Sequence, residues 1–257
     1  MWMHLFLCSS ATLTFFNYHY LEILHHCTKF GEKGFFRFNY KFEAVKKYLS
    51  ILTGLLLSGL TSVYAQTLSG NLNGHEYIDL GLPSGTKWAT MNVGADSNNI
   101  FGGYFAWGEV STKAEYGKDV QTYNKDASTL FAANIINEDG TLTSNYDAAT
   151  KNWGEGWRMP SKKEFDELIE NCEWEWDKTR VGYYVKGKNG NSIFLPAAGN
   201  YFGSSQKEAG YGRYWCASVD ESNSFRSWCL CFHSISKYMS NGSYGRYYGR
   251  PIRPVTD

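Results

Sequence analysis

The sequence lacks several features that would place it in a specialised structural class. It has only 5 Pro among 257 residues, and its 26 Gly occur without a fixed period, which excludes a collagen-like chain. Aromatic residues make up 17%, which excludes a disordered or coiled-coil protein. Neither sign of charge is in excess, since 25 Lys and Arg face 25 Asp and Glu. That balance argues against a nucleic-acid partner and against a polybasic membrane patch.

The sequence also lacks the motifs of common enzyme and cofactor sites. Only His75 and His233 follow residue 65, so a Ser-His-Asp or Cys-His arrangement has few candidate members. Neither a Walker-type loop nor a dinucleotide fingerprint occurs. The Glu-Pro-Asn or Gln-Pro-Asp and Trp-Asn-Asp motifs of calcium-dependent lectins are missing too. We therefore expect no enzymatic activity, no cofactor and no calcium-mediated sugar binding.

Residues 45–65 are typical of a secretory signal peptide. Two lysines at 46 and 47 precede an apolar stretch that contains Ser, Thr and Gly and ends in Val63-Tyr64-Ala65. This pattern predicts cleavage between Ala65 and Gln66, which leaves no stable membrane span. The residue directly after the cleavage point is not Cys, so a lipoprotein anchor is not expected. The protein is predicted to be secreted or displayed on the cell surface.

Residues 1–44 precede this signal and show no sustained period and no capping pattern. A signal peptide normally begins at the initiator. Two interpretations remain open: translation starts at Val45 through an alternative start codon, so that 1–44 is translated upstream sequence, or the signal has a long n-region. After cleavage, residues 66–74 form a short polar linker to a single domain, residues 75–257, which is long enough for one well-filled core.

The pattern after residue 75 predicts an α+β domain of short antiparallel strands and hairpins, two helices and long irregular loops. The first helix begins after Asp147 and ends at Gly154, and the second has a capping box of Ser161 and Glu164. Residues 111–146 are polar and look like a long irregular excursion. Strands are expected at 76–80, 86–93, 102–110, 183–186, 192–195, 213–219, 226–233 and 249–255.

Five stretches together carry a family resemblance: EYIDLGLPSGTKWATMNVGA, GYFAWGE, DAATKNWGEGWRMPSKKEFDELI, GNSIFLPAAG and RYYGRPIRPV. The set, which spans about 75–255, resembles the Fibrobacter succinogenes major paralogous domain family of secreted Bacteroidetes-type proteins. The resemblance implies a C-type-lectin-like fold, shared more distantly with formylglycine-generating enzymes, whose Trp-Arg-Leu-Pro corresponds to 157–160 here. It implies display and binding, and related folds also serve as variable proteins diversified by retroelements.

The segment 214–248 has the composition of a binding surface. The connection 234–249 is dense in Tyr, Ser, Asn, Gly and Arg, as antibody-type binding loops are. This composition suits an extracellular glycan or protein ligand. The alternative is that Tyr and Gly merely fill turns, and Arg246 has a rival role as a structural tie to the closing strand. The residues predicted to contact ligand are Tyr214, Arg226, Trp228, His233, Tyr238, Asn241, Tyr244, Arg246 and Tyr247.

Four cysteines follow residue 65: Cys172, Cys216, Cys229 and Cys231. An even number in an exported protein suggests disulfides, and a bridge between Cys216 and Cys229 is expected first because their strands are joined by a short turn. Cys229, Cys231 and His233 share one strand face, but a metal would need them to converge with a fourth ligand, so no metal is expected. Two alternatives to a binding module stay open: a formylglycine-generating-type oxidase using Cys229 and Cys231, and a structural subunit of a surface assembly.

Overall fold

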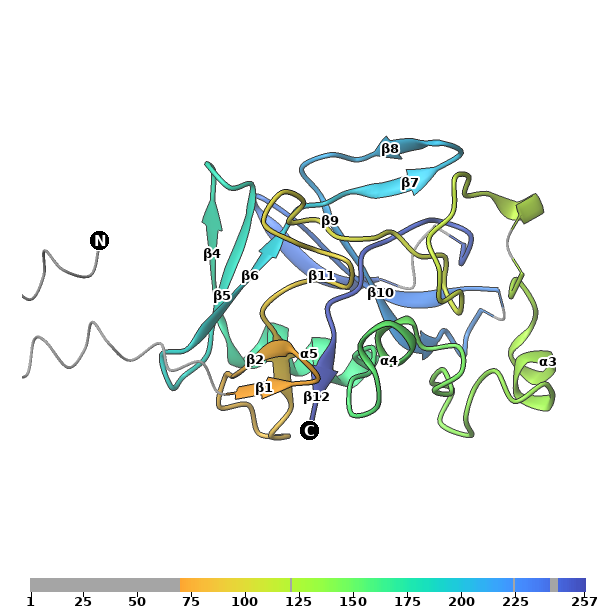
Figure 1. The fold of residues 1–257 in the computed structure, drawn as a ribbon, viewed down its shortest axis with the longest axis horizontal. Helices are drawn as coiled ribbons and strands as arrows, with labels where there is room; N and C mark the ends of the chain where they lie inside the picture. The colour runs from red at the N-terminus through yellow and green to blue at the C-terminus, as the bar shows by residue number, and fades with distance from the viewer. Residues whose placement is uncertain (1–69, 121, 224, 241–244) are drawn as a thin grey trace, which may run out of the picture. The chain divides into compact units, whose positions relative to one another are not determined.

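The computed structural model describes residues 70–120, 122–223, 225–240 and 245–257, all within the unit 64–257 (Figure 1). The predicted signal peptide with its cleavage site at Ala65 and Gln66 lies outside the described residues, as do Asn241 and Tyr244. The described part is a mixed α+β structure with several small antiparallel sheets and three short α-helices. The expected α+β class is therefore confirmed. None of the helices in these ranges is long and apolar enough to cross a membrane.

The elements are short throughout. The strands are β1 (Gly70–Leu72), β2 (His75–Asp79), β3 (Lys87–Ala89), β4 (Glu173–Asp177), β5 (Gly182–Lys186), β6 (Ser192–Pro196), β7 (Asn200–Phe202), β8 (Ser205–Lys207), β9 (Gly212–Val219), β10 (Ser227–His233), β11 (Ser236–Ser240) and β12 (Val255–Thr256). The helices are the 3-10 helix η1 (Lys118–Val120), α3 (Ala127–Ala132), α4 (Ala148–Trp153) and α5 (Lys162–Asn171).

The strands form four antiparallel groups, ordered β1-β2-β3-β12, β4-β5-β6, β7-β8 and β11-β10-β9. The first group brings the two ends of the domain together, because Val255 of β12 lies opposite Trp88 of β3. Figure 1 shows β12 next to the orange strands β1 and β2. The last group is the central one, since both of its faces are covered by buried side chains.

The two expected helices form as their capping signals predict. The Asp147 side chain accepts a hydrogen bond from the backbone of Thr150, and Gly154 ends α4 with a positive φ of 90°. In α5 both halves of the capping box between Ser161 and Glu164 are present. A third helix, α3, begins after Asp126 within the stretch expected to be irregular.

Three expected strands are wrong over most of their length, and in 86–93 only Lys87–Ala89 forms a strand. In 102–110 only one isolated bridge forms, between Phe105 and Arg250, because Gly102 and Gly108 adopt positive φ and interrupt the extended run. In 249–255 only the last residue belongs to a strand, since prolines at 251 and 254 have no N–H to donate to a ladder. Conversely, β11 lies in a connection expected to be loop.

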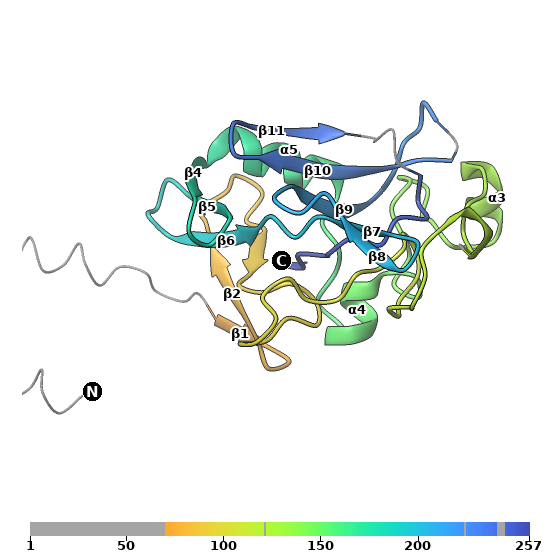
Figure 2. The same ribbon diagram turned by 90° about the horizontal axis from the view of Figure 1, so that it is seen from above.

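The central sheet separates two hydrophobic clusters. Trp215, Ala217, Cys229 and Cys231 belong to the first cluster, together with Trp107 and Trp157. Tyr214, Cys216, Leu230 and Phe232 belong to the second, which includes Phe165 and Leu168 of α5. The expectation that Trp228, Leu230 and Phe232 share one face is confirmed. Figure 2 shows α5 running alongside β10 and β11, so this helix covers the second face.

One buried arginine connects the C-terminal segment to residues 89–92 and to β6. Arg253 is 1% exposed and donates from Nε to Asn92 Oδ1 at 2.8 Å. Its terminal nitrogens donate to the main-chain oxygens of Ala89, Thr90 and Phe194 at 2.9, 3.0 and 2.8 Å. Burial lowers the pKa of Arg253 to about 10, but these four bonds compensate the loss of water around the charge.

Replacing Arg253 with Lys should therefore lower the free energy of unfolding by about 2–4 kcal/mol, because one ammonium cannot reach the partners at both 89–92 and 194. Urea denaturation followed by fluorescence measures this loss. Arg226→Lys, at a half-buried position between β9 and β10, is the control and should stay within about 0.5 kcal/mol. A loss at Arg253 as small as that of the control would contradict the assigned role.

A second prediction concerns acid stability. Glu164 is nine-tenths buried and accepts bonds from Arg158 at 2.7 and 2.8 Å and from the backbone of Ser161 at 2.7 Å. Burial alone would raise the pKa of Glu164, but these bonds outweigh it and the pKa lies below its ordinary value. The carboxylate therefore stabilises the fold above its unfolded pKa of about 4.3, and this contribution is lost as the pH falls through the folded pKa.

Glu164→Gln should be less stable than the wild type at pH 7, and the difference should narrow as the pH falls below about 4. Denaturation curves at several pH values test this, with the exposed Glu170→Gln as control. A difference that stays constant with pH would mean that the charge of Glu164 adds nothing to stability.

Candidate functional site

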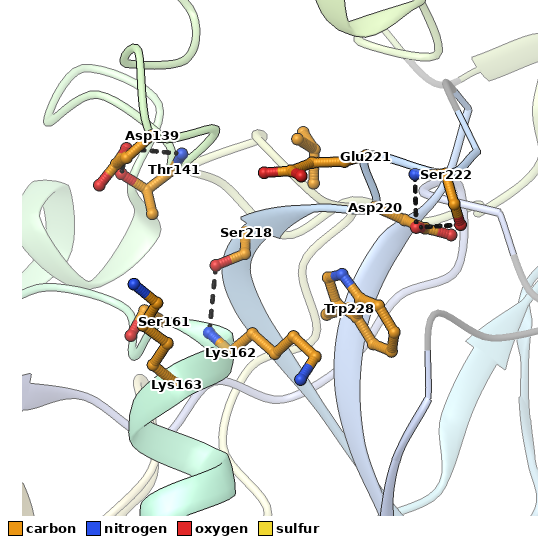
Figure 3. Close-up of a pocket in the computed structure, with 11 residues that line it drawn as sticks. Asp139, Thr141, Ser161, Lys162, Lys163, Ser218, Asp220, Glu221, Ser222 and Trp228 are labelled. Carbon is orange, nitrogen blue, oxygen red and sulfur yellow. Dashed lines mark hydrogen bonds between the residues drawn. The ribbon is translucent and has the colours of Figure 1, made fainter.

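An open pocket lies between the start of α5 and the β9–β10 hairpin (Figure 3). Its volume is about 470 Å³, within the range of small-molecule sites. Three segments line it: the turn at 139–141, the first residues of α5 at 161–163, and the hairpin at 218–222 with Trp228. The walls are mostly charged or hydroxyl side chains, and the indole of Trp228 is the one large aromatic surface among them.

The walls are fixed to each other by hydrogen bonds between α5 and β9. The backbone N–H of Lys162 donates to Ser218 Oγ at 3.1 Å, and that of Ala217 donates to the carbonyl of Pro160 at 2.8 Å. The capping box between Ser161 and Glu164 fixes the first turn of α5. The pocket is therefore preformed by rigid elements, as precise binding sites require.

Trp228 projects from β10 toward Lys162, whose ammonium lies 4.8 Å from the ring centroid. The same ammonium pairs with Asp166 one helical turn further along α5. The indole is half-buried, because it also packs at the edge of the second hydrophobic cluster. Lys162 therefore orients the indole and has its own charge largely neutralised.

Three carboxylates line the pocket together with this indole. Asp220, 1% exposed, accepts hydrogen bonds from the backbone and hydroxyl of Ser222 at 3.0 and 2.7 Å. Asp139 accepts from the hydroxyl and backbone of Thr141, and the hydroxyl bond lowers the pKa of Asp139 below its usual value. Glu221 is exposed at the rim. With Lys162 neutralised by Asp166, the pocket presents more negative than positive charge.

Two residues predicted to bind ligand lie in the interior instead. Tyr214 is 0% exposed, and its hydroxyl donates to the carbonyl of Pro196 at 2.7 Å. Arg246 is also 0% exposed and donates to Ser227 Oγ and to the carbonyls of Lys125 and Arg226 at 2.7–2.9 Å. Their assignment as ligand contacts is wrong, since the sheet that carries Tyr214 is covered on both faces. Arg246 has a structural role, but its side chain bonds β10, the residue before β10 and residue 125 rather than the closing strand.

The other predicted residues do not gather around Trp228. Tyr238 is 45% exposed on the edge strand β11, and it lies opposite Cys231, on the face of the sheet away from Trp228. His233 shares that face and lies 2.9 Å from Ser236 Oγ. Tyr247 packs against Phe202, and Arg226 is half-buried in the β9–β10 hairpin. The predicted binding segment is therefore divided between two faces.

Most pocket residues were not expected from the sequence to bind a ligand. Lys162 and Lys163 read as part of a capped helix, while Asp139 lies in a polar stretch expected to be irregular. Asp220 and Glu221 lie between two expected strands, and no sequence motif marks them as ligand contacts. Only Trp228 was expected at a binding site. Nothing in the sequence brings 139, 162 and 220 together, because their proximity arises from tertiary packing.

The expected disulfide between Cys216 and Cys229 is not formed, and Cys172, Cys216, Cys229 and Cys231 are all free. Cys216 faces the second hydrophobic cluster and donates to the carbonyl of Trp228, while Cys229 faces the first cluster. The two sulfurs lie on opposite sides of the sheet, because 216 and 229 are not opposite each other in the strand register. Within the described ranges, no three His, Cys, Asp or Glu side chains converge to hold a metal ion.

Comparison with protein-family models, curated proteins and solved structures found no match. The resemblance carried by the five sequence stretches therefore stays a prediction from those residues. The geometry of the pocket and of the interior is what supports a functional proposal.

The division between core and surface can be tested directly. Tyr214→Ala should lower the free energy of unfolding by about 3–5 kcal/mol, because it leaves a cavity in the core and removes the hydrogen bonds that the hydroxyl makes with Pro196 and Asn92. Tyr238→Ala, at an exposed position, should cost less than about 1 kcal/mol. Thermal and urea denaturation of both variants measure the contrast, and similar losses in the two would contradict the assignment.

Proposed function

We propose that the chain is a secreted or cell-surface binding module with a C-type-lectin-like fold, and that it binds a glycan in the pocket beside Trp228. The observation that carries the proposal is a half-buried indole in an open pocket whose other walls are carboxylates, ammonium groups and hydroxyls on rigid elements. The C–H face of a sugar packs on an aromatic ring, while its hydroxyls need several hydrogen-bonding partners around the ring. The pocket offers both kinds of surface.

The lectin-like assignment is supported by the arrangement of the small sheets. The first and last strands, β1 and β12, belong to one four-stranded sheet. The two capped helices follow in the order that the resemblance implies. Long segments without regular structure, such as 90–117, connect these elements. These features are shared with lectin-like domains, in which irregular loops are held by paired ends of the chain.

The charge of the pocket selects among glycans. Asp220 is buried and interacts electrostatically with Arg246. The carboxylates that a ligand meets are therefore those of Asp139 and Glu221, beside Lys163 and a Lys162 that already pairs with Asp166. The carboxylates of the pocket repel the carboxylate of an acidic sugar and therefore disfavour its binding. The ligand is therefore a neutral or amino-bearing oligosaccharide.

A binding role also fits the cysteines better than an oxidase role. Cys229 and Cys231 are at most 1% exposed, so the thiols cannot reach a cysteine on a polypeptide substrate without a large opening of the fold. The pocket beside Trp228 lies on the other face of the same sheet. A structural subunit of a surface assembly is the remaining alternative, and it predicts self-association instead of sugar binding.

The proposal is tested by a panel of neutral, amino and acidic oligosaccharides, with binding measured by calorimetry. Trp228→Ala and Glu221→Gln should each weaken binding at least about tenfold, equivalent to about 1.4 kcal/mol, for a neutral or amino sugar. Trp176→Ala removes another half-buried indole, on β4, and is the matched control that should bind as the wild type does.

Two outcomes would count against the proposal. Unchanged affinity in Trp228→Ala, in protein whose melting temperature matches the control, would move the site elsewhere. Failure to bind any sugar together with concentration-dependent oligomers in light scattering would favour the structural subunit. Glu221→Gln keeps the test informative even if Trp228→Ala disturbs the packing beneath the ring, because Glu221 is exposed.

A further inference from the structure

Two buried thiols lie in contact on the first face of the central sheet. Cys229 and Cys231 are separated by one residue on β10, so their side chains point to the same side, and their Sγ atoms are 3.3 Å apart. The other two cysteines lie elsewhere in the fold. Cys216 faces the opposite cluster, and Cys172 lies at the end of α5. The proposed binding site uses neither Cys229 nor Cys231.

Two arginines surround this pair. Arg213 on β9 lies opposite Cys231 in the strand register, is 5% exposed and pairs with Glu208 at 2.9 Å. Arg250 is 0% exposed, and its guanidinium lies 4.2 Å from the ring centre of Trp215, the residue opposite Cys229. Positive charge close to a thiol favours the thiolate, which is the nucleophilic form.

The two thiols differ in acidity because of this arrangement. The hydrogen bond from Cys229 lowers the pKa of Cys231 to about 6, and Arg250 and Arg213 contribute to the same shift. Burial raises the pKa of Cys229 above its usual value. Burial likewise raises the pKa of Cys172 to about 11 and of Cys216 to about 12. Cys231 is therefore the more acidic thiol of the pair, and Cys229 is the less acidic one.

We propose that Cys229 and Cys231 form a peroxide-sensitive dithiol, in which Cys231 is oxidised first and Cys229 then closes an intrachain disulfide. The Cys231 thiolate attacks one oxygen of hydrogen peroxide, the O–O bond breaks and hydroxide leaves, so that Cys231 becomes a sulfenic acid. The sulfur of Cys229 then displaces the hydroxyl group of that acid. The S–S bond forms, the thiol proton leaves with the hydroxyl as water, and the two electrons lost by the thiols reduce the peroxide.

The burial of the pair determines which oxidant it can meet. Both cysteines are at most 1% exposed, so a protein disulfide or a thiol oxidoreductase cannot contact either sulfur. A peroxide is small enough to enter through local fluctuations of the fold. The chemical class of the reagent is therefore a small peroxide, which restricts this site to oxidative signals or oxidative stress.

The strand geometry makes the disulfide reversible. Same-face positions two apart on a strand have Cα atoms about 6–7 Å apart, at the upper end of the range that a disulfide spans. Such a bond is strained and therefore reduced more readily than a structural disulfide. A reductant small enough to enter the fold as the peroxide does is expected to restore the dithiol.

The test uses reduced full-length protein treated with hydrogen peroxide, alkylated in denaturant and mapped by peptide mass spectrometry. The peptide with Cys229 and Cys231 should lose two hydrogens and escape alkylation, while Cys172 and Cys216 stay alkylated. Cys229→Ser should stop at a sulfenic acid on Cys231 that dimedone captures. In Cys231→Ser, oxidation of Cys229 should be at least about tenfold slower.

Cys216→Ser is the matched control, because it removes a buried thiol on the other face of the same sheet and should oxidise at the wild-type rate. The proposal is overturned if Cys172 or Cys216 reacts before Cys231, or if no disulfide joins Cys229 and Cys231. The order of oxidation in the wild-type protein distinguishes these results even if a serine variant fails to fold. Sugar binding is measured separately, so failure of this proposal leaves the binding proposal untouched.

Discussion

The burial of the β9–β10 pair on both faces is the constraint on which the rest of the structure depends. A sheet of three strands has few interior positions, yet here side chains on either side lie in hydrophobic clusters. A strand covered on both faces cannot alternate apolar and polar residues, and β9 accordingly reads GRYWCASV. The double covering explains why Tyr214 is core, why Cys216 and Cys229 cannot meet, and why Trp228 reaches a pocket only at the rim.

The C-terminal segment is held by backbone hydrogen bonds to several separate segments and by the side chains of three arginines. Arg246, Arg250 and Arg253 follow one another closely, and each is at most 1% exposed. Arg246 and Arg253 donate to main-chain carbonyls of segments far away in the sequence, and Arg246 and Arg250 also stack on tryptophan rings. Buried guanidinium groups can bind several carbonyls at once in fixed directions, which suits a segment whose prolines prevent a regular strand.

The two faces of the central sheet support different chemistry. The second face ends in an open, preformed pocket whose single indole and surrounding carboxylates suit a sugar. The first face encloses two thiols in contact beside two arginines, a closed site that only a small reagent can enter. One physical cause underlies both sites, because alternate residues of β10 point to opposite sides. Trp228 and Cys229 are neighbours in sequence and belong to separate environments.

The sequence by itself determined the α+β class, α4 and α5 with their caps, the β5–β6 hairpin and the shared face of Trp228, Leu230 and Phe232. These features rest on local patterns: capping residues, a tight Asn-Gly turn and a period of two. Only the tertiary structure decided which face of each strand is covered, and hence that Tyr214 and Arg246 are interior while Lys162 and Asp220 share a pocket with Trp228. The physical reason is that burial and charge pairing depend on segments more than fifty residues apart, whose proximity no local pattern encodes.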